Sequence, residues 1–134
     1  MSQLSHVDPP GLFPGAPYHY GTITAPGAML FTAGACPLDA EGRIVDLDDR
    51  PAQARVALDN LDAVLTEAGA SYEGLIRTTV YVVGTPDDLV EVWDVVAARF
   101  APHQPPSTLL GVAALGYPGQ LVEIDAIAAL PNHV

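Results

Sequence analysis

The chain has 134 residues, enough for one ordinary domain, and 49% of them are hydrophobic while only 16% are charged. This balance excludes an intrinsically disordered protein, because disordered chains combine low hydrophobicity with high charge. Sixteen acidic residues stand against five arginines and no lysine, which gives a formal net charge of −11. Binding to nucleic acid and to anionic membranes depends on basic side chains, so the sequence predicts neither partner.

The single cysteine, Cys36, excludes an intramolecular disulfide and a metal site built from several cysteines. The N-terminal residues lack the basic and apolar segments of a signal peptide, and no apolar run approaches the roughly 18 residues of a membrane-spanning helix. We therefore expect a soluble cytoplasmic protein. Because the chain is small, apolar and sparsely charged, we also expect subunit contacts to cover part of its apolar surface.

The first third of the chain predicts short elements within a single domain that spans residues 1–134. Residues 1–16 are rich in proline and glycine and predict an irregular N-terminal arm. Residues 18–24 and 28–33 predict two short strands joined by a turn. A loop is expected to follow, over residues 36–49.

Two amphipathic helices are the clearest predicted elements. The first is expected to begin after Asp49, which can cap it, and to end at Gly69, a residue type typical of helix ends. The second is expected to begin after Thr85, with Asp88 as the partner in a capping box. Apolar residues recur in both helices at spacings of three and four, and Trp93 on the second of these stripes is interpreted as a core residue.

Three further strands are predicted at residues 75–83, 107–113 and 121–130, from their β-branched and alternating residues. A turn at residues 116–119 joins the last two. The element order β-β-α-β-α-β-β predicts an α+β domain in which two helices cover one face of a mixed β-sheet.

Alternation along these strands places a mixed set of side chains on the opposite face of the sheet. Arg77 and Tyr81 share that face with Glu123 and Asp125. The face is too polar for a core and too apolar in places for an ordinary surface. We therefore expect it to form a subunit interface that includes polar groups.

The sequence lacks several common signatures of enzymes: a glycine-rich phosphate loop, His-Glu-x-x-His, Cys-x-x-Cys and Gly-x-Ser-x-Gly. Its four histidines are not spaced like metal ligands, so no metal site is expected. Cys36 is either a reactive thiol or a small half-buried side chain. The second interpretation is favoured, because no base lies near it in the sequence.

Glu123 is the most informative acidic residue, because it lies inside an apolar strand where a carboxylate is costly unless it is paired or used. One interpretation is a general acid/base in a desolvated interface cleft. The other is an ion pair with Arg77, which lies on the same sheet face. Buried ion pairs and active sites both place acids in such positions, so the two interpretations stay open at this point.

An ordered series of motifs resembles a known family. The series includes Pro17-Tyr18, Phe31-Thr-Ala-Gly34, Arg77-Thr-Thr-Val80 and Leu121-Val-Glu-Ile-Asp-Ala-Ile-Ala128. Each motif is short, but the order and spacing from about residue 17 to residue 128 are similar to those of the reactive intermediate deaminase (Rid) family.

The resemblance implies a chorismate-mutase-like α+β subunit in a homotrimer, with the sheets facing inward and a small-molecule cleft between neighbouring subunits. It also implies hydrolysis of enamines and imines to ketones or keto acids and ammonia, with no cofactor. The residues that match the family's catalytic positions are Glu123, which would hold water, and Tyr18, in the cleft. The substrate-binding positions that the resemblance implies are Ser107, Thr108, Leu109 and Gly34.

One family residue is replaced in this chain. Related deaminases carry Pro-Ala-Arg-Ser/Thr after the second helix, whereas this chain reads Pro105-Pro106-Ser107-Thr108. The family arginine grips a substrate carboxylate through two parallel hydrogen bonds, which a serine hydroxyl cannot reproduce. Trp93 also stands where an asparagine is common.

The sequence therefore supports a trimeric hydrolase for a C=N or enamine substrate that lacks a clamped carboxylate, with Glu123 as acid/base, Tyr18 lining the site and Ser107 donating a hydrogen bond. The alternative is a non-catalytic trimer that binds a metabolite or a protein. A ribonuclease activity, which some relatives are labelled with, fits poorly with a net charge of −11. Arg77 and His19 are the cations that the sequence offers in place of the missing arginine.

Overall fold

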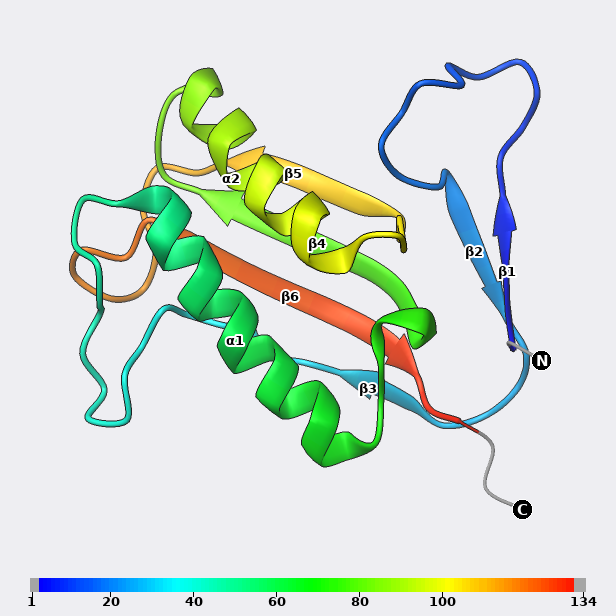
Figure 1. Ribbon diagram of the computed structural model, residues 1–134, viewed down its shortest axis with the longest axis horizontal. Helices are drawn as coiled ribbons and strands as arrows, with labels where there is room; N and C mark the ends of the chain where they lie inside the picture. The colour runs from blue at the N-terminus through cyan, green and yellow to red at the C-terminus, as the bar shows by residue number, and fades with distance from the viewer. Residues whose placement is uncertain (1–2, 132–134) are drawn as a thin grey trace.

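The computed structural model describes residues 3–131. Over these residues the chain forms, in order, β1 (Leu4–Val7), β2 (Gly21–Thr24), β3 (Met29–Phe31), α1 (Arg50–Ala68), a 3-10 turn η1 (Tyr72–Gly74), β4 (Leu75–Val82), α2 (Pro86–Phe100), β5 (Ser107–Gly111) and β6 (Val122–Ala129) (Figure 1).

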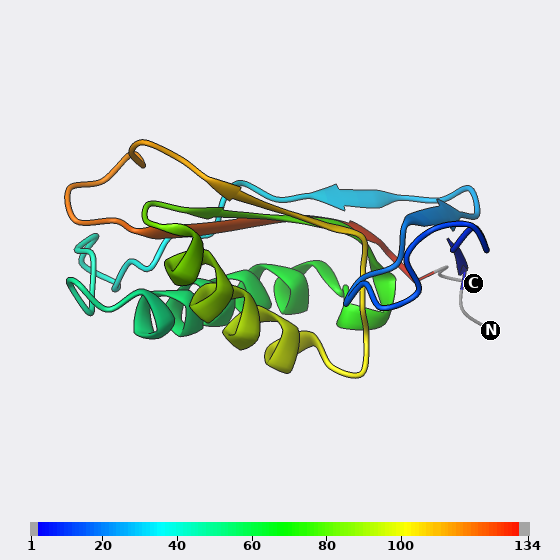
Figure 2. The same cartoon turned by 90° about the horizontal axis from the view of Figure 1, so that it is seen from above.

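A mixed four-stranded sheet with the strand order β3-β6-β4-β5 forms the centre of the molecule. Strands β4 and β5 are parallel and are connected through α2, whereas β6 runs antiparallel to both β3 and β4. Figure 2 shows α1 and α2 side by side on one face of this sheet. This arrangement confirms the predicted α+β class and the chorismate-mutase-like subunit.

The hydrophobic core lies between the helices and the sheet. Alternate residues of β6 are fully buried, because they face the helices, and the same holds for β4 beyond its first residues. The largest buried aliphatic side chains of the core are Leu58, Leu61, Leu75, Val80, Val82, Val92, Val96, Val122 and Ile124.

Both helices begin where the sequence predicts. The carboxylate of Asp49 accepts a hydrogen bond of 3.0 Å from the backbone N–H of Ala52. Gly69 ends α1 in the left-handed conformation, with φ of 79°. At the start of α2, Thr85 and Asp88 form a capping box in which each side chain accepts a hydrogen bond from the other residue's backbone N–H.

A buried glutamine fixes the segment that leads into β6. The side chain of Gln53 accepts a hydrogen bond of 2.8 Å from the backbone N–H of Leu121 and donates one of 3.0 Å to the carbonyl oxygen of Gly119. Gln53 is fully buried in α1, so both amide atoms need partners. The contact ties the start of β6 to α1 and so fixes the register of that strand.

The expectation of an irregular arm over residues 1–16 is wrong for Leu4–Val7. These residues pair antiparallel with β2, so that β1 and β2 form a separate two-stranded sheet. The pairing is supported by side chains distant in sequence. The His6 ring stacks on that of His19 at 3.8 Å, and Asp8 accepts a 3.0 Å hydrogen bond from the N–H of Tyr20.

In two places, strands that follow each other in the sequence do not pair. The strands at 18–24 and 28–33 do not pair, because β2 joins β1 whereas β3 joins β6. The strand that begins at residue 107 does not pair with the last strand either. The α2 crossover places β5 beside β4 in parallel, and β6 inserts between β3 and β4.

Candidate functional site

Glu123 lies half-buried on the sheet face opposite the helices. Its neighbours in β6, Val122 and Ile124, are fully buried on the helix side, so the two-residue period of the strand turns Glu123 the other way. Its Oε1 atom accepts a hydrogen bond of 3.2 Å from Nε2 of Gln120 and one of 3.3 Å from Sγ of Cys36. The carboxylate is therefore held in place by neutral donors.

Gly34 lies directly against the Glu123 side chain. A Cβ atom added to Gly34 would be 2.6 Å from Cγ of Glu123 and still closer to its carboxyl group. This segment is fixed beside β6, because the N–H of Ala35 donates to the carbonyl oxygen of Ile124 at 2.7 Å and the reverse bond measures 3.1 Å. The absence of a side chain at Gly34 leaves the space that the carboxylate occupies.

The ion pair of Glu123 with Arg77 is the wrong interpretation for the single chain. Strand register places Arg77 opposite Ile127, whereas Glu123 is opposite Tyr81. The guanidinium of Arg77 instead donates a hydrogen bond of 3.3 Å to Oγ1 of Thr108. The ion pairs that the structure shows within residues 3–131 do not include Glu123 with Arg77.

Cys36 is a half-buried thiol. Burial, together with the hydrogen bond to Glu123 and the charge of that carboxylate, raises the pKa of Cys36 to about 11. The thiolate is the nucleophilic form, so the side chain is poorly suited to nucleophilic catalysis at neutral pH. Cys36 acts here as a hydrogen-bond donor to Glu123.

Tyr18, Ser107 and Thr108 come together at a second place, around an open cavity of about 340 Å³ that we call the outer cavity. Arg77 and His19 also line it, so both cations singled out in the sequence reach this cavity. His19 is already engaged, because its Nδ1 lies 2.7 Å from a carboxylate oxygen of Asp8.

The outer cavity and Glu123 are separate within one chain. Ser107 pairs with Thr78, which in turn pairs with Ala126 of β6. Glu123 lies three residues before Ala126 in β6, which is about 10 Å at the usual strand rise. In addition, β4 separates β6 from β5 in the sheet. The structure thus brings Glu123 together with Gly34, and Tyr18 with Ser107 and Thr108, but it does not join the two groups.

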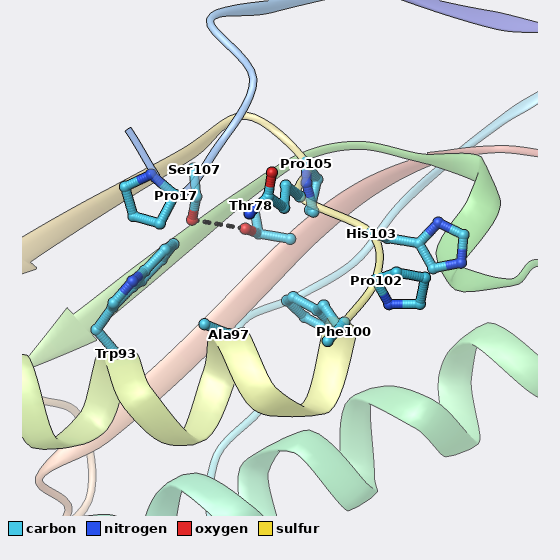
Figure 3. A pocket seen from close by; sticks show the side chains of 11 residues that line it. Pro17, Thr78, Trp93, Ala97, Phe100, Pro102, His103, Pro105 and Ser107 are labelled. Atoms are coloured by element: carbon cyan, nitrogen blue, oxygen red, sulfur yellow. Dashed lines mark hydrogen bonds between the residues drawn. The ribbon is translucent and has the colours of Figure 1, made fainter. Parts of the chain in front are cut away.

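A second hollow, which we call the inner pocket, opens between α2 and β5 (Figure 3). Trp93, which we expected in the core, is only half-buried and forms a wall of this pocket. The periodic stripe identifies the helix face correctly, but it cannot distinguish a core position from a pocket wall at the edge of the same face. Trp93 and Leu109 both pack against the hydrophobic core as partly buried side chains, and Leu109 does not line the outer cavity.

Residues 3–131 contain neither a metal-binding cluster of His, Cys, Asp and Glu side chains nor a membrane-spanning helix. No three His, Cys, Asp or Glu side chains in this range are grouped so that they could hold a metal ion. No helix in the same range has the length and hydrophobicity required to cross a membrane.

Comparison with known proteins identifies the family. A family profile described as endoribonuclease L-PSP matches residues 12–130. TdcF of Escherichia coli, by name a reactive intermediate deaminase, is 33% identical over 120 residues, which cover 86% of this chain and 89% of TdcF. The RutC family protein slr0709 of Synechocystis is 34% identical over 114 residues, which cover 84% and 87% of the two chains.

Solved structures give the same result. A Rid-family protein of unknown function from Yersinia pestis, YyfB, superposes with a TM-score of 0.88 at 30% identity, over 96% of this chain and 99% of that one. E. coli TdcF with bound serine superposes with a TM-score of 0.69 at 31% identity, over 87% and 90%.

The fold and these matches thus define a small α+β protein that is homologous to a protein named as a deaminase. The chain belongs to the Rid family, which the ordered motifs of the sequence already resembled.

The thiol of Cys36 provides a direct test of the Glu123 environment. We predict that alkylation of Cys36 by iodoacetamide is slow at pH 8 and rises with a midpoint near the pKa of about 11. In Glu123→Gln the midpoint should move to lower pH, because the carboxylate no longer opposes formation of the thiolate. Rates are measured by mass spectrometry across pH.

The matched control is Asp125→Asn, which removes the other acid of the same β6 face. The carboxylate of Asp125 accepts a hydrogen bond from Tyr81 and is not among the groups that shift Cys36. A wild-type midpoint near the ordinary thiol value of 9.0, or equal shifts in both variants, would contradict the described contact.

Proposed function

We propose that the protein is a homotrimeric hydrolase of imine or enamine substrates whose carboxylate, if any, is not clamped by an arginine. The observation that carries this proposal is the Glu123 carboxylate, which is fixed by Cys36 and Gln120 against the backbone of Gly34. The ion pairs described within residues 3–131 do not include Glu123, and a general acid/base must not be locked in a tight ion pair. The deaminase name of TdcF supports the same reaction class.

The reaction needs one water molecule and an acid/base. Glu123 takes a proton from water as the water oxygen attacks the carbon of a protonated C=N group. The resulting carbinolamine nitrogen then takes that proton, and as the C–N bond breaks Glu123 removes the hydroxyl proton, so that the carbonyl compound forms. The departing ammonia takes this proton and leaves as ammonium. Water addition and departure of the amine thus use the same carboxylate, first as base and then as acid.

The uncovered sheet face supports a trimer. Phe31 and Met29 of β3 are 65% and 46% exposed, and Leu110 of β5 is also exposed. Large apolar side chains beside half-buried polar ones are typical of a surface that a neighbouring subunit covers. A closed ring of three subunits, with this face inside, would remove these side chains from water.

The trimer also gives a reason for the distance between the two groups of candidate residues. In the proposed assembly, Glu123 and Gly34 of one subunit face the outer cavity of its neighbour, which supplies Tyr18, Ser107 and Thr108. Each cleft would then hold an acid/base from one subunit and substrate contacts from the other.

A second candidate function is a non-catalytic trimer that binds a metabolite or a protein. The observation that favours it is the loss of the family arginine, since Ser107 forms its 2.7 Å hydrogen bond with Thr78 inside the chain. Cleavage of RNA, which the family description names, is not proposed, because a net charge of −11 opposes phosphate binding.

The assembly is tested by light scattering after gel filtration. We predict one species of about 42 kDa, three times the chain mass of 14.0 kDa, at micromolar concentration. Phe31→Glu should lower this mass, because it places a charge in the proposed interface. Val64→Glu serves as a matched control, since Val64 is an exposed apolar residue of α1. A wild-type monomer would contradict both the trimer and the shared cleft.

The missing arginine predicts weak activity on ordinary imino acids. We expect little hydrolysis of 2-iminopropionate or 2-iminobutyrate made in situ by an amino-acid oxidase, measured by competition with semicarbazide. A bidentate charged contact is worth a few kcal/mol, so its loss weakens binding on the order of a hundredfold. Ser107→Arg should restore part of the activity.

The informative control is Arg77→Gln, because Arg77 lines the outer cavity. If the wild type hydrolyses imino acids as well as Ser107→Arg does, and Arg77→Gln removes this activity, then Arg77 clamps the carboxylate and the proposed substrate class is wrong.

A further inference from the structure

The inner pocket is lined mainly by apolar side chains and lies next to the outer cavity, where the substrate is proposed to bind. Its volume is about 110 Å³, and Trp93, Ala97 and Phe100 of α2 form one side. Pro17 and Pro105 contribute further walls, and Figure 3 shows these side chains turned toward a common space with Ser107 at its edge.

The lining side chains with polar atoms are those of Thr78, His103, Gln104 and Ser107. The hydroxyl groups of Thr78 and Ser107 are 2.7 Å apart and hydrogen-bond to each other. His103 is the only ionisable side chain in the lining, which contains neither arginine nor lysine. A carboxylate in this pocket would lose water without meeting a permanently charged arginine or lysine, which is unfavourable, whereas an apolar group would gain from burial.

The inner pocket adjoins the outer cavity. Ser107 lines both, and Pro17 of the inner pocket directly precedes Tyr18 of the outer cavity. Ser107 is therefore the side chain past which a substituent of a molecule in the outer cavity would reach the inner pocket.

We propose that the inner pocket binds a short, uncharged aliphatic substituent of the substrate, so that the protein selects apolar imines or their ketone products over imino acids and keto acids. The identity of the reacting group rests on the proposed function, whereas the binding of an aliphatic substituent rests on the pocket alone. A pocket of about 110 Å³ is smaller than the cavity of about 150 Å³ that takes up benzene, so a chain of three or four carbons suits it better than a large ring. Trp93 is then a specificity-determining residue.

The experiment uses the only tryptophan of the chain as a probe. In ¹⁵N-labelled protein, the single indole N–H signal is Trp93, and it is followed by NMR during titration with 2-pentanone or with 2-oxopentanoate. These two ketones share a propyl chain, but 2-pentanone carries a methyl group where 2-oxopentanoate carries a carboxylate. We expect a saturable shift with 2-pentanone and an affinity for 2-oxopentanoate that is at least tenfold lower.

Matched variants of α2 locate the binding. Ala97→Leu should fill the pocket and weaken 2-pentanone binding at least tenfold, whereas Ala98→Leu, on the exposed side of the same helix, should leave it unchanged. Ser107→Arg should reverse the preference in favour of 2-oxopentanoate. This third variant keeps the proposal testable if Ala97→Leu fails to fold.

Each outcome decides the proposal. Equal or tighter binding of 2-oxopentanoate by the wild type, no saturable shift with 2-pentanone, or equal effects of Ala97→Leu and Ala98→Leu would overturn it. Glu123→Gln tests the pocket separately from the proposed function. Because Glu123 does not line the pocket, this variant should still bind 2-pentanone even if it hydrolyses no imine. Selective 2-pentanone binding by a protein that hydrolyses no imine would overturn the proposed function and leave the pocket assignment standing.

Discussion

The two-residue period of β6 is the constraint on which the site depends. Val122, Ile124 and Ala126 are buried against the helices, so the residues between them must face the uncovered side of the sheet. A shift of the register by one residue would place Glu123 in the hydrophobic core, where an unpaired carboxylate is very costly. The hydrophobic core thus fixes the direction of the proposed acid/base.

Two contacts fix the position of Glu123 along the strand. Gln53 binds the backbone at the entry to β6, and the segment that contains Gly34 pairs with Ile124 through Ala35. The carboxylate therefore lies against a backbone without a side chain and is oriented by donors that carry no charge. This arrangement differs from a structural ion pair, in which a cation would favour the ionised form throughout.

The replacements at Ser107 and Trp93 change the other half of the proposed cleft. The resemblance places an arginine and commonly an asparagine at these positions, and both would make it polar. Here a small hydroxyl and an indole border an apolar pocket instead. Because both residues line the inner pocket, the two changes support one altered ligand preference beside the proposed acid/base at Glu123.

Locally encoded features could be predicted from the sequence. The caps of α1 and α2 depend on residues within four positions of each other, such as Thr85 and Asp88, so the helices begin where expected. The outward direction of Glu123 and Asp125 follows from alternation within β6 alone.

Features that depend on distant residues could not be predicted. Pairing of Leu4–Val7 with β2 depends on a histidine stack and on contacts of Asp8 that cross a proline-rich loop. Insertion of β6 between β3 and β4 depends on the whole sheet. The position of Trp93 at a pocket wall depends on where α2 ends relative to β5, which helical periodicity does not encode.

The central claim, that Glu123 is the acid/base, is tested most directly by the rate of imine hydrolysis in Glu123→Gln. The substrate is an imine without a carboxylate, made in situ from butylamine by an amine oxidase. Its hydrolysis is measured by competition with semicarbazide, and the melting temperature is measured in parallel. If Glu123 is the acid/base, the wild type accelerates hydrolysis and Glu123→Gln does not. The two proteins should melt within a few degrees of each other. A variant that hydrolyses the imine at the wild-type rate would contradict the account.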